Sequence, residues 1–215
     1  METLSDKIPN LELKTHKGDN YEFKTIEGFI TLPTWQSFQS RQGAYSSVDK
    51  STPSDGSVKI SIGGDMTDDN PQITNEHVSA YNFVTQHQKK IKSVLLTALK
   101  KDYKNLQDLY DYDEESSADI MPNVNNISQF KSLIGLSTVH IMNVSKDGIA
   151  YVGYEFGCRW DDEHGLGIMT HKHRVVKIGL ADTSFLTWIA QQDKSPETNE
   201  LAVEKLKKNP WWKFW

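Results

Sequence analysis

The sequence is poor in cysteine, in long apolar runs and in positive charge. Cys158 is the only cysteine, which excludes a disulfide within the chain and any zinc site built from several cysteines. No apolar stretch approaches the roughly 18 residues of a membrane-spanning helix, and the N-terminal residues lack a basic region followed by an apolar run. These absences predict a soluble, cytoplasmic protein.

The balance of charge argues against a nucleic-acid-binding protein. The net charge is -5, because 24 Lys and Arg residues are scattered among 29 Asp and Glu residues. Contact with phosphate groups needs a clustered basic face. A basic protein is therefore the partner that this composition favours, and we expect neither a nucleic acid nor a membrane as a partner.

The N-terminal part of the chain has the residue pattern of β-structure. Four segments predict strands: Leu11–Thr15, Tyr21–Lys24, Phe29–Leu32 and Val58–Ile62. Residues 17–20 suit a hairpin loop between the first two. Gln39–Gly56 is rich in Ser, Gln, Asp and Gly, so it predicts a long loop.

Residues 74–104 predict one long helix. Thr74 is a suitable N-cap, and Glu76 lies at the positive end of the helix dipole. Apolar residues recur along one face at helical spacing: Tyr81, Val84, Ile91, Leu95, Ala98 and Leu99. This face should pack on a sheet, with His87 as a hydrogen-bonded packing residue. The acidic residues between 108 and 115 predict a solvated loop, because the glycine of a calcium-binding loop is missing.

Residues 136–180 return to a β pattern. Leu136–Val144 and Ile149–Cys158 should form a hairpin, since Asp147-Gly148 between them supplies a tight turn. The even positions of the second strand, Cys158 included, are apolar and should face the core. On its other face, Gly153 and Gly157 suit a bulge, a bend, or the close approach of a ligand or a second backbone.

Three smaller elements complete the expected secondary structure. Ser128–Leu133 suits a short helix, and Gly167–Thr170 should form a hairpin with Arg174–Leu180. Asp182 should cap a short helix that ends at Ile189.

Together these elements predict an α+β fold: an antiparallel, bent β-sheet with one long helix packed on it and a short C-terminal helix. We expect a single α+β domain over residues 1–192, since a single long helix cannot complete two cores. Residues 193–215 should form a C-terminal helix and a Trp-rich tail.

The most unusual chemistry lies in residues 160–167, which run Trp-Asp-Asp-Glu-His-Gly-Leu-Gly. Three hypotheses compete for this block. As a turn at a strand end it could present carboxylates to Arg and Lys of a partner, with Trp160 as an anchor. As a metal-dependent hydrolase site it would use Glu163, His164, His171 and His173. As a structural element it would use Asp161 as a cap, His164 as a backbone partner and the glycines for special dihedral angles.

The run from Gly153 to Gly167, followed by Arg174-Val175-Val176 and Ile178-Gly179, resembles an uncharacterised bacterial family of the Bacteroidetes type. That family carries a Gly-Tyr-x-Phe-x-Cys-x-Trp-Asp-x-Glu-His-Gly-Leu-Gly block and is described as a domain of unknown function. Such proteins are similar to immunity proteins encoded beside toxin genes. The resemblance therefore implies an immunity-type inhibitor and transfers no catalytic residue.

The sequence thus favours a binding protein over an enzyme, with a basic toxin domain as its partner. The expected partner-binding residues are Trp160, Asp161, Asp162, Glu163, His164, His171 and Arg174. We expect no catalytic residue, cofactor or metal, because a Gly-rich phosphate loop, a nucleophile elbow and the helical His-Glu-x-x-His pattern are all missing. The metal-dependent hydrolase stays as the alternative.

The chain ends in Trp211-Trp212-Lys213-Phe214-Trp215, and these rings should dock either on this chain or on a second copy in a homodimer. Deleting them should lower the melting temperature by several degrees or convert a dimer to a monomer. An unchanged melting temperature together with an unchanged mass in light scattering would contradict both forms of docking.

Overall fold

The computed structural model describes residues 7–18, 21–40, 49–63, 71–113 and 118–195. Its strands are β1 Leu11–Gly18, β2 Tyr21–Thr31, β3 Gln39–Ser40, β4 Asp49–Pro53, β5 Ser57–Gly63, β6 Ile134–Lys146, β7 Ile149–Cys158, β8 Asp161–His171 and β9 Arg174–Gly179. Its helices are η2 Pro33–Trp35, α1 Asn75–Tyr110, η4 Ile127–Ser132, η5 Ala181–Ser184 and α3 Thr187–Lys194. The predicted α+β class is confirmed.

Seven strands form one sheet in the order β1-β2-β5-β6-β7-β8-β9. All neighbouring pairs are antiparallel except β5 and β6, which run parallel. A parallel pair needs a long crossover, and the segment between β5 and β6 contains α1. The long helix is therefore the connection that allows the one parallel pair, which the sequence alone did not predict.

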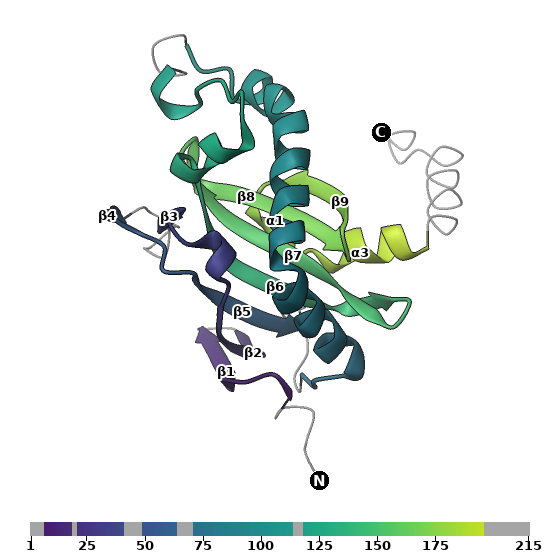
Figure 1. Cartoon of the computed structure of the whole chain (residues 1–215). Helices are drawn as coiled ribbons and strands as arrows, with labels where there is room; N and C mark the ends of the chain where they lie inside the picture. The colour runs from purple at the N-terminus through teal and green to yellow at the C-terminus, as the bar shows by residue number, and fades with distance from the viewer. Residues whose placement is uncertain (1–6, 19–20, 41–48, 64–70, 114–117, 196–215) are drawn as a thin grey trace, which may run out of the picture.

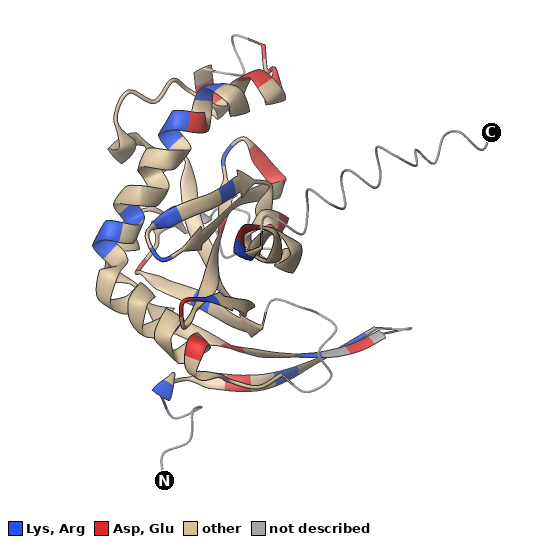
Figure 2. Cartoon of the chain, turned by 90° about the vertical axis from the view of Figure 1, so that its right-hand side faces the viewer, with Lys and Arg blue, Asp and Glu red and all other residues tan. Residues whose placement is uncertain are grey.

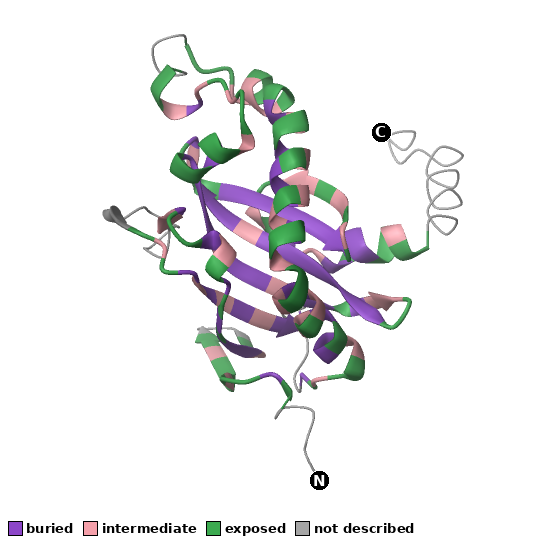
Figure 3. Cartoon of the chain, viewed as in Figure 1, coloured by how far each residue is buried: buried purple, intermediate pink, exposed green. Residues whose placement is uncertain are grey.

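Helix α1 lies across one face of this sheet (Figure 1). Thr74 caps it as predicted, and the helix extends over 36 residues to Tyr110 rather than ending at residue 104. Its buried residues recur at helical spacing: His77, Val78, Ala80, Val84, Ile91, Leu95, Leu96, Leu99 and Tyr103. The opposite side of the helix is exposed, as Figure 3 shows, which is the pattern of an amphipathic helix on a sheet.

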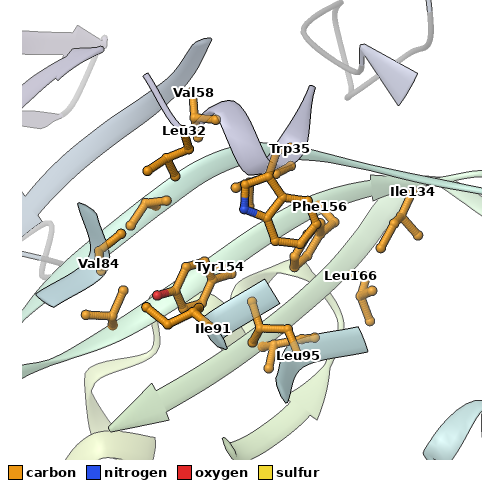
Figure 4. Close-up of a cluster of buried hydrophobic side chains, with 14 of the residues drawn as sticks. Leu32, Trp35, Val58, Val84, Ile91, Leu95, Ile134, Tyr154, Phe156 and Leu166 are labelled. Atoms are coloured by element: carbon orange, nitrogen blue, oxygen red, sulfur yellow. The ribbon is translucent and has the colours of Figure 1, made fainter. Parts of the chain in front are cut away.

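The main core fills the space between α1 and the sheet (Figure 4). Trp35 of η2 packs against Phe156 of β7 with ring centroids 5.4 Å apart, so η2 closes one end of this core. Tyr154, also on β7, is 1% exposed. The even positions of β7 therefore face the core as predicted, and a fully buried side chain of this size contributes about 1.5–3 kcal/mol.

The odd face of β7 is also buried, which the sequence did not predict. A second, smaller cluster covers it, formed by Met142, Val144, Tyr151, Met169, Ile189 and Ala190. Beside this cluster, η5 lies directly on Gly153, where an added Cβ would stand 1.6 Å from the carbonyl oxygen of Ser184. Of the predicted reasons for this glycine, the close approach of a second backbone is the one observed.

Three local predictions need correction. Phe29–Leu32 is not a separate strand, because β2 pairs with β1 at its start and with β5 at its end and so continues to Thr31. The predicted loop Gln39–Gly56 contains the short β3–β4 pair. Asp182 does not cap a helix to Ile189, because the chain there forms two helices, η5 and α3, whose N-caps make no side-chain hydrogen bond.

The expected domain boundary at residue 192 lies near the end of the last described helix. Asp193 lies inside α3, and its carboxylate accepts a hydrogen bond from Arg174. The predicted helix after it and the Trp-rich tail lie outside the described residues. Within the described part of the chain, every helix is too short or too polar to cross a membrane.

Gly153→Ala should lower the free energy of unfolding by about 3 kcal/mol or more, because the new methyl group would overlap the backbone of η5. Gly148→Ala is the matched control. Its added Cβ would meet no atom within 4 Å. The loss of free energy of unfolding should therefore come only from the φ of +72° and be about 1 kcal/mol. Equal losses in denaturant unfolding would show that η5 does not rest on Gly153.

Candidate functional site

The acidic block is the start of a strand and not the predicted turn. The turn consists of Arg159 and Trp160, and β8 begins at Asp161, which pairs with Cys158. The next pairing joins Phe156 to Leu166, so residues 162–165 stand opposite Gly157 alone. These four residues, named the acidic bulge below, are pushed out of the ladder. Gly165 closes the bulge with a φ of +64°, a value that favours glycine.

Asp161 holds the acidic bulge in place. Its carboxylate accepts hydrogen bonds from the Tyr110 hydroxyl at 2.6 Å, the His164 backbone N–H at 2.8 Å and His164 Nδ1 at 3.1 Å. Burial raises the pKa of Asp161, but the hydrogen bonds from Tyr110 and His164 together lower it by more than burial raises it. The pKa therefore lies below its ordinary value. Asp161 is therefore a structural carboxylate, as the third hypothesis expected.

A second tyrosine, Tyr112, binds the chain just before β8. The Tyr112 hydroxyl donates to the Trp160 carbonyl oxygen at 2.6 Å, and the rings of Tyr110 and Tyr112 stack with centroids 6.0 Å apart. Trp160 itself is 2% exposed and packs edge-on against Tyr103, so it is a core residue in this chain. Tyr110 and Tyr112, named the tyrosine clamp below, join the end of α1 to the start of β8.

Exposed carboxylates lie on both sides of the clamp. Asp162 and Glu163 in the acidic bulge are exposed, as are Asp111 and Asp113 just after α1. Asp162 lies close enough to Tyr112 to help raise the pKa of that phenol, after burial and the charge of Asp161. We name these four carboxylates the acidic surface. Figure 2 shows acidic residues in red at the end of α1 and at the start of β8.

The position of this surface is unfavourable for the helix. The C-terminus of a helix carries partial negative charge, and the last turn of α1 contains no basic residue. Asp111 also serves as the C-cap with a φ of +45°, a conformation that glycine adopts more easily. The sequence therefore places negative charge where it reduces stability.

His171 and Arg174, both expected at the site, lie at the opposite end of β8. His171 is 6% exposed, and its Nε2 donates to the Lys146 carbonyl oxygen at 2.9 Å. Arg174 donates to Asp193 at 2.8 Å and 2.5 Å. These bonds and the one from the Tyr151 hydroxyl outweigh burial, which raises the pKa of Asp193, and lower that pKa to about 2. Both residues have partners within the chain and fix α3 and the β6–β7 hairpin to the sheet.

The same separation applies to the proposed metal ligands. Glu163 and His164 lie in the acidic bulge, whereas His171 is the last residue of β8 and His173 lies in the turn after it, on the order of 15 Å further along the strand. The structure does not bring this set together. Among the described residues, no three His, Cys, Asp or Glu side chains gather in a way that could hold a metal ion.

A family model described as Domain of unknown function (DUF6985) matches residues 26–186. The chain belongs to the DUF6985 family. The match runs from within β2 to the residue before α3, so it includes the tyrosine clamp and the acidic bulge. No curated protein and no solved structure gave a match. The DUF6985 description states no activity.

The tyrosine clamp is the part of the site that sequence reasoning missed. Tyr110 and Tyr112 were expected in a solvated acidic loop, because the helix was expected to end at residue 104. The signal was the Tyr-x-Tyr spacing at the end of an amphipathic helix, where two rings at alternate positions can point to one neighbour.

Tyr110→Phe should cost about 1.5–3 kcal/mol of folding free energy at neutral pH, because it removes a hydrogen bond to a charged carboxylate. The pKa of Asp161 is lower in the folded state, so this stabilisation is present above the ordinary aspartate pKa and is lost as the pH falls through the lowered value. The difference between the variant and the natural protein should therefore shrink in strongly acidic solution.

Tyr112→Phe is the control for this prediction, since it removes a tyrosine hydroxyl bond of the same 2.6 Å length to a neutral carbonyl oxygen. It should cost about 1 kcal/mol, with little change between neutral and acidic pH. Urea unfolding of the natural protein and of both variants, at neutral and at acidic pH, measures the loss of folding free energy for each variant at each pH. A cost that is the same for both variants at every pH would contradict the role given to Asp161.

Proposed function

We propose that this protein is a non-enzymatic binding protein that uses the acidic surface to hold a basic protein partner. The partner that fits best is a bacterial toxin domain, which the protein would inhibit in the cytoplasm in the manner of an immunity protein. Arg and Lys side chains of the toxin would pair with Asp162, Glu163, Asp111 and Asp113. Neither a cofactor nor a metal takes part.

One observation carries this proposal: the exposed carboxylates stand on a rigid base. The backbone and the ring of His164 tie the acidic bulge to Asp161, and the tyrosine clamp fixes the start of β8 to α1. A partner that binds a fixed set of charges loses less conformational entropy than one that must order a loop. Pre-organised charges therefore support binding better than a solvated turn would.

The loss of stability caused by the acidic surface also supports a binding role for it. Charges of the wrong sign at a helix terminus typically reduce stability by about 0.3–1 kcal/mol each. Asp111 and Asp113 follow the C-terminus of α1 without a basic residue in the last turn. Residues that reduce stability in this way are expected where function needs them.

The residues of the predicted block have two different roles in this proposal. Trp160 and Asp161 have structural roles within the chain, whereas Asp162, Glu163 and His164 are exposed and form the surface that a partner would contact. The metal-dependent hydrolase receives no support, because its four ligands lie at two ends of β8.

Replacing Asp162 and Glu163 together by Asn and Gln tests the proposal. Both side chains are exposed, so the free energy of unfolding should change by no more than about 1 kcal/mol. Binding should weaken by about 2–5 kcal/mol, because a carboxylate buried against Arg or Lys in the complex is lost. The readouts are affinity for the protein encoded by the neighbouring gene, protection of cells against it, and denaturant unfolding.

The matched control changes two exposed glutamates at the distant edge of the sheet, Glu12→Gln with Glu22→Gln. This variant has the same change in net charge and should bind normally. Full protection by the Asp162 and Glu163 variant would place the interface elsewhere. Equal weakening by both variants would show that only the overall charge matters.

A further inference from the structure

The first half of α1 is attached to the sheet by a histidine that must be neutral. His77 is 2% exposed and occupies the third position of the helix. The Thr74 backbone N–H donates to His77 Nδ1 at 3.1 Å, so Nδ1 carries no proton. His77 Nε2 lies 3.1 Å from the Met142 carbonyl oxygen on β6, so it carries the proton and donates it. A second proton on the ring would remove the acceptor that Thr74 needs.

The surroundings of His77 oppose that second proton. Burial lowers its pKa, and the compensating groups are few: the Met142 carbonyl on β6, Glu76 on its own helix, Asn143 and the Gln72 backbone. The net pKa lies below the ordinary histidine value. Protonation therefore competes with the attachment of the helix to β6.

A second group of rings attaches the same half of α1 to the turn between β8 and β9. Phe83 stacks on His87 at 4.4 Å between centroids, and His173 lies 4.7 Å from Phe83 and 5.4 Å from His87. The Nε2 atom of His173 is buried without a hydrogen-bond partner in the described structure.

The charges around His173 also disfavour its protonation. Burial, His87 and Lys90 all lower its pKa. Next to His173 in the sequence, Lys172 Nζ lies 4.0 Å from Asp147 Oδ2, and Arg174 pairs with Asp193. A charged His173 would therefore stand beside Lys90, while Asp147 and Asp193 already pair with Lys172 and Arg174.

Beyond this point the helix is attached differently. The backbone leaves helical geometry at His87, with φ -111° and ψ 17°. Directly after this kink, the Thr34 N–H donates to Gln88 Oε1 at 3.2 Å, and Lys92 Nζ donates to the Thr34 carbonyl at 2.7 Å. These bonds do not involve a histidine.

The apolar contacts divide at the same place. Before the kink the buried apolar residues are small, Val78, Ala80 and Val84, and the larger Tyr81 and Phe83 are only partly buried. After it they are larger: Ile91, Leu95, Leu96, Leu99 and Tyr103. The first half of the helix therefore depends more on its histidine contacts than the second half does.

We propose that residues 75–87 form an acid-released segment that is hinged at His87 and leaves the sheet when His77 and His173 gain protons, while residues 88–110 stay in place. The direction follows from linkage. A histidine that binds protons more weakly in the attached state favours attachment at neutral pH, and this stabilisation is lost as the pH falls below about 6.5. The inference is independent of the proposed function.

Hydrogen exchange of the whole chain at about pH 7.5 and pH 5.5, corrected for intrinsic rates, tests the hinge. Amides of residues 78–87 should lose protection at least about tenfold at the lower pH, while those of residues 91–103 keep theirs. Equal protection of residues 78–87 at both pH values would overturn the proposal, as would equal loss along the whole helix.

His77→Gln makes the test specific, because glutamine is an ordinary third residue of a capping box and does not titrate. It should keep residues 78–87 more protected than the natural protein at pH 5.5. His140→Gln, on a half-buried histidine paired with Glu155 away from α1, should leave the acid response unchanged. Unreduced acid release in His77→Gln would contradict the mechanism. Should that variant fail to fold, exchange of the natural chain decides alone.

Discussion

The hydrogen bonds to Asp161 are the interaction on which the site depends. One carboxylate receives the hydroxyl of Tyr110 from the end of α1 and both the backbone and the ring of His164 from the acidic bulge. A helix end, a strand start and a bulge thereby share one charged acceptor. Hydrogen bonds to an ionised group are stronger than neutral ones, so the exposed carboxylates beside it are held in place.

Close packing of backbone on backbone fixes the other end of the sheet. Gly153 lets η5 lie against β7, and α3 then covers a second cluster through Ile189 and Ala190. Arg174 and His171 act here, in contacts within the chain. The residues expected at the site thus lie at two ends of β8. Those at one end have structural roles, and those at the other end are proposed to bind a partner.

Features set by neighbouring residues could be predicted from the sequence. Thr74 caps α1, Asp147-Gly148 turns the β6–β7 hairpin, and the even positions of β7 face the core. Features that join distant residues could not. Tyr110 meets Asp161 across 51 positions, and the β5–β6 parallel pair appears only once α1 is known to cross the sheet. The bulge was missed for the same reason, since its register depends on Cys158 and Phe156 in the neighbouring strand.

We propose that a basic partner sits on the acidic bulge. Carbodiimide coupling joins a carboxylate to a lysine only where the two are in contact, so it would map the interface directly if a mixture with the protein encoded by the neighbouring gene is treated and digested. We predict that cross-linked peptides contain Asp162 or Glu163 joined to partner lysines, and that Tyr110→Phe reduces their yield. Cross-links confined to other carboxylates, such as Glu12 and Glu22 at the far edge of the sheet, would contradict the claim.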